Sequence, residues 1–66
     1  MPYYIKKRSN PQVGTYYVGM GKMKVKEAKA HDTSLYGNNE MLRFDSQDAY
    51  EQELDTLRIA GESVTR

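Results

Sequence analysis

The first third of the chain alternates apolar and polar positions, which is typical of β-strands. Residues 3–8 begin with two tyrosines and an isoleucine and end in three cations, and residues 15–20 are again rich in aromatic and β-branched side chains. Between them, residues 9–14 concentrate asparagine, proline and glycine, which favour a chain reversal. The pattern predicts a β-hairpin whose second strand ends in a bulge or bend near residues 19–22.

The remaining two thirds of the chain predict two helices and two further strands. Residues 24–31 are rich in good helix formers, and turn-forming residues interrupt the chain over most of residues 32–39. Residues 41–44 are apolar enough for a third strand, and residues 47–60 form the clearest helix. Residues 62–66 have the character of a final edge strand, so the predicted order of elements is ββαβαβ.

An apolar stripe on the second predicted helix indicates where the core lies. Tyr50, Leu54 and Leu57 recur at intervals of four and three residues, so they share one helix face. Ser46 can cap the start of this helix and a glycine can end it. We expect a small α+β domain over residues 1–66, with an antiparallel-rich sheet and both helices on one face. The residues expected in the core are Ile5, Val18, Met20, Leu42 or Phe44, Tyr50, Leu54 and Leu57.

The size of the chain limits what such a fold can be. Its 66 residues allow one domain, and a domain this small buries only about 60% of the surface that its unfolded chain exposes. The chain has no cysteine, so neither disulfides nor a thiolate zinc site can support a thin core. Its apolar runs are far shorter than the roughly 20 residues of a membrane-spanning helix, and it begins without the apolar stretch of a signal peptide. We expect a soluble, cytoplasmic monomer that does not bind membranes.

Charge is divided unevenly along the chain, although the net charge is only +1. Residues 1–31 hold seven lysines and arginines and one acid, whereas residues 32–66 hold eight acids and three arginines. This division predicts either a basic surface for an acidic partner or two halves that attract each other within the fold. Both interpretations stay open, because exposed ion pairs contribute only about 0 to 1 kcal/mol each.

Candidate catalytic and metal-binding groups are few. His31 is the single histidine, with Glu27 one helical turn before it and Asp32 after it, and this spacing does not match a zinc site of three or four ligands. It indicates instead a surface pair of Glu27 and His31 on a helix. Gly19 and Gly21 lack the third glycine of a dinucleotide-binding loop. We therefore predict no enzymatic activity, no catalytic residue, no cofactor and no metal.

Tyrosines beside cations are the clearest binding signal in the sequence. Two tyrosine pairs, at residues 3–4 and 16–17, lie on the strands of the predicted hairpin, so alternation turns one tyrosine of each pair outward. They predict cover for the open face of the sheet, a protein-contact patch or a platform for stacked bases. We favour protein binding, because no RNA-recognition motif accompanies them, and keep a small RNA- or DNA-binding module as the alternative. The predicted partner-binding residues are Lys6, Lys7, Arg8, Asn10, Gln12 and Tyr17.

Several segments resemble the small single-domain proteins of tailed bacteriophages in size and texture. The resemblance is carried by residues 4–12, 14–17, 34–37 and 41–44. It implies a protein that binds one host enzyme stoichiometrically in the bacterial cytoplasm, for example RNA polymerase, a nuclease or a CRISPR effector, and that inhibits or redirects it. A third interpretation is a virion or scaffold component that associates with itself through an open strand edge.

Overall fold

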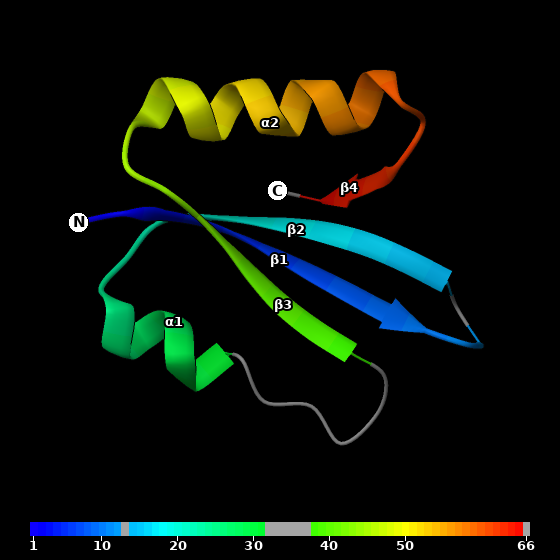
Figure 1. Ribbon diagram of the computed structural model, residues 1–66, viewed down its shortest axis with the longest axis horizontal. Helices are drawn as coiled ribbons and strands as arrows, with labels where there is room; N and C mark the ends of the chain where they lie inside the picture. Colours follow the sequence, from blue (N-terminus) through cyan, green and yellow to red (C-terminus); the bar gives the residue numbers. More distant parts are fainter. Residues whose placement is uncertain (13, 32–37, 66) are drawn as a thin grey trace.

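The computed structural model describes residues 1–12, 14–31 and 38–65, which form a four-stranded sheet and two helices (Figure 1). The α+β class and the predicted ββαβαβ order are confirmed. Predictions for residues 32–37, including the break after the first helix, and for residue 66 lie outside the described residues. The predicted turn at residues 38–39 is wrong, because the third strand already begins at Asn38. The elements are β1 (Tyr3–Asn10), β2 (Gly14–Lys22), α1 (Val25–His31), β3 (Asn38–Phe44), α2 (Gln47–Ile59) and β4 (Ser63–Thr65).

β1 lies in the centre of the sheet, between β2 and β3. The strand order is β3-β1-β2-β4, with β1 antiparallel to both of its neighbours and β4 parallel to β2. The register between β1 and β2 shifts between Tyr4 and Ile5, opposite residues 19–21. The predicted bulge is therefore confirmed, but the prediction that β2 ends there is wrong. Pairing resumes beyond the bulge, where Lys22 lies opposite Tyr3.

α2 packs its apolar stripe against one face of the sheet. Ile5 and Leu54 are fully buried, and Tyr17 and Tyr50 complete the core cluster with them. Partly buried side chains from β3, β4 and α2 surround this cluster, and Tyr3 of β1 is packed against it as well. The surrounding residues from the other strands and from α2 are Leu42, Phe44, Leu57 and Val64.

Gly19 allows α2 to approach the sheet closely. A Cβ atom at this position would lie 2.7 Å from the hydroxyl oxygen of Tyr50 and 3.2 Å from a methyl carbon of Leu54, so α2 occupies the space that a side chain would need. The Tyr50 hydroxyl oxygen accepts a hydrogen bond of 3.0 Å from the backbone N–H of Gly21. The rings of Tyr50 and Tyr3 are tilted against each other, with centroids 5.4 Å apart. These contacts attach α2 to the bulged end of the hairpin.

The observed core differs from the predicted core in β2. Val18 and Met20 are half-buried and lie outside the core cluster, so their prediction as core residues is wrong. The reason is the register: Ile5 lies opposite Gly19, and the face of β2 beneath α2 therefore carries Gly19 and Tyr17. Tyr17 thus takes the place in the core that the prediction gave to Val18 and Met20.

α1 covers the opposite face of the sheet, so the prediction that both helices share one face is wrong. In β1, Tyr4 alternates with Ile5 and therefore points away from α2. A large aromatic side chain on that face needs cover, and α1 supplies it. Tyr4 is 5% exposed and Ala28 of α1 is 3% exposed, and both line a pocket together with Met41 of β3. Figure 1 shows the two helices on opposite sides of the strands.

Both ends of α2 have the predicted caps. The hydroxyl oxygen of Ser46 accepts a hydrogen bond of 3.2 Å from the backbone N–H of Ala49. Gly61 follows the helix with a φ of +84°, and its N–H donates to the carbonyl of Arg58 at 3.0 Å. The chain then returns to pair β4 with β2, which places Val64 beside the core.

Candidate partner-binding surface

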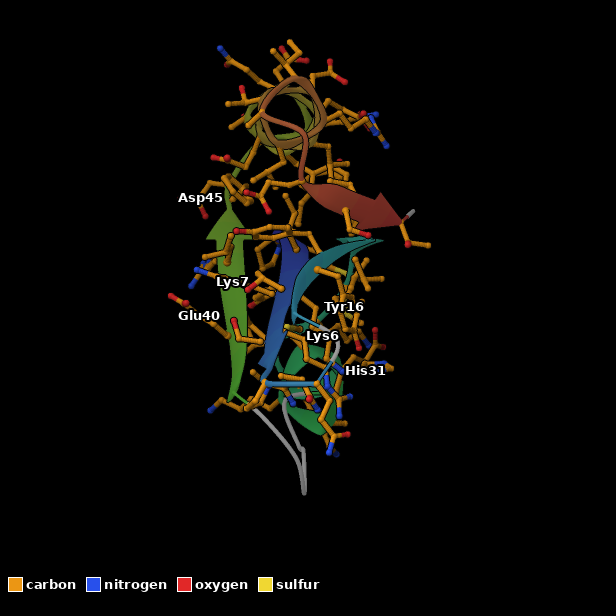
Figure 2. All side chains as sticks on the ribbon, turned by 90° about the vertical axis from the view of Figure 1, so that its right-hand side faces the viewer. Lys6, Lys7, Tyr16, His31, Glu40 and Asp45 are labelled. Atoms are coloured by element: carbon orange, nitrogen blue, oxygen red, sulfur yellow. The ribbon has the colours of Figure 1, made fainter. Side chains whose placement is uncertain are left out.

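Alternation along β1 sends the cations of the hairpin to opposite faces of the sheet. In register, Lys7 lies between Tyr17 of β2 and Glu40 of β3, on the side of α2. Lys6 lies opposite Met41 on the side of α1. Figure 2 shows Lys7 and Glu40 on one side of the ribbon and Lys6 on the other. The three consecutive cations of β1 therefore do not form one patch.

Arg8 and Tyr16 lie directly opposite each other on the α1 side of the hairpin. Both side chains are half-buried. Among the other hairpin tyrosines, Tyr4 and Tyr17 are buried and Tyr3 is packed against the core cluster. Tyr3 and Tyr16 are both half-buried, but Tyr3 contacts the core cluster. Tyr16 is therefore the one of these four tyrosines that is partly exposed away from the core.

Two predicted partner-binding residues have structural roles. Tyr17 is 9% exposed and belongs to the core cluster, so it is not available as a contact residue, contrary to the prediction. The Asn10 side-chain oxygen Oδ1 accepts a hydrogen bond of 2.8 Å from the backbone N–H of Gln12, which stabilises the predicted turn. Gln12 itself is exposed at the tip of the hairpin. Its role in binding stays a prediction.

Further cations lie on and beside α1. Lys24 directly precedes this helix, and Lys26 and Lys29 lie within it, and all three are exposed. Because α1 covers the face of the sheet that carries Lys6 and Arg8, the five cations share one side of the molecule. We call this surface the basic face; it consists of Lys6, Arg8, Lys24, Lys26 and Lys29. Its two members in β1 belong to the predicted partner-binding residues, and its three lysines near α1 do not.

α2 carries the opposite charge on the opposite side of the sheet. Asp48 and Asp55 are exposed, and Glu51 and Glu53 are half-buried. The basic residue in the last turn of this helix is Arg58. The fold thus places most of the described cations on one face and most of the described acids on the other, with Lys7 on the α2 side and Glu27 on α1 as exceptions.

The two described ion pairs are local. Arg43 Nε lies 3.5 Å from Asp45 Oδ1, and Arg58 Nη1 lies 3.2 Å from Asp55 Oδ1. All four side chains are exposed and belong to the second half of the chain. Neither of these two pairs joins the basic half to the acidic half, and exposed pairs of this kind contribute little to stability.

An apolar pocket lies between α1 and the sheet, within the basic face. Its volume is about 140 Å³. It reaches the molecular surface, because one of its lining residues, Val25, is 43% exposed. The lining residues are Tyr4, Val25, Ala28, Lys29 and Met41.

Groups that could hold a metal ion are absent from residues 1–12, 14–31 and 38–65, where no three His, Cys, Asp or Glu side chains lie together. Glu27 and His31 are both exposed on α1, and Asp32 lies outside the described residues. The features that remain as candidates among the described residues are the charged side chains of the two faces and the apolar pocket.

Comparisons with protein-family models, with curated proteins and with solved structures found no match for this chain. The resemblance to phage proteins and the host enzyme that it implies therefore stay predictions. Within the described part of the chain, neither helix has the length and hydropathy needed to cross a bilayer.

Proposed function

We propose that this protein is a binding domain without catalytic activity, and that it binds an acidic surface of another protein with its basic face. The supporting observation is the placement of the five cations on one side of the sheet while the carboxylates of α2 lie on the other. Separated charge of this kind attracts an acidic partner to one face and repels it from the other. The proposal keeps Lys6 and Arg8 from the predicted set and adds the lysines near α1.

A nucleic-acid partner fits the basic face less well. A platform for single-stranded bases combines cations with aromatic side chains on which successive bases stack. In the described part of the basic face, the partly exposed ring is that of Tyr16, since Tyr4 is buried under α1. The net charge of +1 also gives little general attraction to phosphates. A protein surface needs no series of rings, and the half-buried Val18 beside Lys6 suits it.

The resemblance to phage proteins suggests which partner to look for. A host enzyme such as RNA polymerase, with an acidic surface, would be bound one to one in the bacterial cytoplasm. Binding would inhibit or redirect the enzyme by blocking a site or by shifting its conformation, and the small domain would perform no turnover of its own.

The first test is a pull-down from bacterial lysate with the immobilised protein, with and without nuclease treatment. We expect a captured protein that remains after nuclease treatment and is released as salt rises. Salt should release it because the screening length falls from about 30 Å at 0.01 M to about 8 Å at 0.15 M. Loss of the captured protein after nuclease treatment would instead support the nucleic-acid alternative.

Two double variants with the same change in net charge then locate the surface. Lys24→Ala/Lys26→Ala removes two cations from the basic face, and Ala49→Glu/Gln52→Glu adds two anions to α2. All four positions are exposed, so both variants should fold. By isothermal titration calorimetry, the affinity for the captured protein should fall at least tenfold in the first variant, about 1.4 kcal/mol, and less than about twofold in the second. Equal losses would mean that net charge, and not the basic face, governs binding.

A further inference from the structure

The apolar pocket is the part of the basic face that charge alone does not explain. Its volume of about 140 Å³ is close to that of a dry protein cavity of about 150 Å³ that binds benzene. The pocket therefore has room for one apolar side chain of the size of leucine or phenylalanine.

One wall of the pocket is open to solvent. Tyr4 and Ala28 are almost completely buried, whereas Val25 is apolar and yet 43% exposed. α1 has only seven residues and contributes one buried residue, so it covers this face of the sheet incompletely. An exposed valine beside an apolar pocket is the arrangement expected where a second molecule completes the packing.

Lysines outnumber acids among the charged side chains on and beside α1, with Lys24, Lys26 and Lys29 against Glu27. Lys29 lines the pocket and is itself exposed, so its aliphatic stem can contact an apolar group while its ammonium group stays in water. Lys26 lies three residues before it on the same helix and is also exposed. The matching occupant is an apolar side chain with carboxylates next to it in sequence.

We propose that the pocket receives one leucine or phenylalanine side chain from an acidic segment of the partner. This inference rests on the proposed function and names the part of the partner that is recognised. The apolar side chain fills the pocket, and the flanking carboxylates face Lys26 and Lys29. A buried anchor of this kind supplies much of the affinity of an interface, whereas charges at its rim act mainly on orientation and association rate.

Short synthetic peptides test the pocket directly. Each peptide has one central residue flanked by glutamates, and the central residue is leucine, phenylalanine or serine. Titrations followed in ¹⁵N–¹H NMR spectra give the affinity and the site together. We expect the leucine and phenylalanine peptides to bind at least tenfold more tightly than the serine peptide, with the largest shifts at Ala28, Lys29 and Met41.

Three variants separate filling of the pocket from general effects. Ala28→Leu places extra volume in the pocket, and Val25→Asp places a carboxylate beside it at the first residue of α1, where an acid favours the helix. Ile59→Asp is the matched control, because Ile59 is an apolar residue of α2 with 87% exposure. Both pocket variants should abolish the preference for leucine over serine, and the control should retain it. If Ala28→Leu fails to fold, Val25→Asp still decides the question.

The outcomes distinguish the pocket from the basic face. Equal binding of the leucine and serine peptides, with shifts at Lys6 and Arg8, would overturn the pocket and leave the proposed function standing. Absence of binding by every peptide would also overturn the pocket, whereas the pull-down with its charge variants would still test the proposed function. A higher melting temperature for Ala28→Leu with an unchanged peptide preference would show a packing defect and not a binding site.

Discussion

The two faces of the sheet are covered by helices that differ in length and in the number of side chains they bury. α2 has 13 residues and buries Tyr50 and Leu54 in a cluster with β1 and β2. α1 has 7 residues, buries Ala28 and leaves an apolar pocket beside it. The α2 face thus provides most of the packing, whereas the α1 face keeps a pocket and exposed cations. The proposed binding surface therefore lies on the face of the sheet that contributes less to the core.

The largest expected effect is on the α2 face. Leu54 is fully buried, so Leu54→Ala should lower the free energy of unfolding by about 2 to 5 kcal/mol. A loss of that size unfolds much of a domain whose total stability is about 5 kcal/mol. Ala28→Gly is the matched change on α1 and should cost only about 1 to 2 kcal/mol. Urea denaturation followed by circular dichroism measures both, and a smaller loss for Leu54→Ala than for Ala28→Gly would contradict the comparison.

Gly19 tests how tightly α2 is packed on the sheet. The added Cβ of Gly19→Ala would meet the Tyr50 hydroxyl at 2.7 Å, and overpacking of this kind costs about 1 to 3 kcal/mol. In a Tyr50→Phe background the nearest atom is gone, so the same substitution should cost less there. The four proteins form a double-mutant cycle, measured by urea denaturation. If the two free-energy changes simply added, the Tyr50 hydroxyl would not be the group that opposes a side chain at position 19.

Sequence reasoning located α2 well because local chemistry defines that helix. Tyr50, Leu54 and Leu57 repeat on one face, and Ser46 and Gly61 mark the two ends. Each of these signals acts over a few residues and needs no knowledge of the rest of the fold. The same holds for the hairpin, whose turn depends on Asn10 and on the glycine at residue 14.

The position of α1 could not be obtained in this way, because its short apolar stripe of Val25 and Ala28 does not show which face of the sheet it covers. The deciding residue is Tyr4 on another element: it alternates with Ile5, so it must point away from α2 and needs cover. Because Tyr4 and Lys6 lie on the same face of β1, the need to cover Tyr4 places α1, with Lys26 and Lys29, on the side of Lys6. The wrong core residues in β2 have a similar cause, since the register across a bulge depends on pairing between strands and not on a local pattern.

A single strand allows the two faces to be compared for binding. Lys6→Ala/Arg8→Ala removes cations from the basic face, and Lys7→Ala removes one from the α2 side. The first variant should lower affinity for the captured protein at least tenfold, about 1.4 kcal/mol, and the second less than about threefold. All three positions are half-buried, so melting temperatures must be compared first. If Lys7→Ala lowered the affinity as much as the double variant, the interface would include both faces of β1 and would not be confined to the basic face.

The smallest effects are expected at two apolar residues that are exposed, one on each helix. Ile59 is 87% exposed on α2 and Val25 is 43% exposed on α1. Replacing either by serine removes little packing, so the free energy of unfolding should change by no more than about 0.5 kcal/mol in thermal denaturation. Binding should respond differently, because Val25 lines the pocket of the basic face and Ile59 does not. Val25→Ser should weaken binding of the captured protein several-fold in calorimetry, and Ile59→Ser should leave it unchanged. Were Ile59→Ser to weaken binding as much as Val25→Ser, the outer side of α2 would belong to the interface, and binding would not be confined to the weakly covered face.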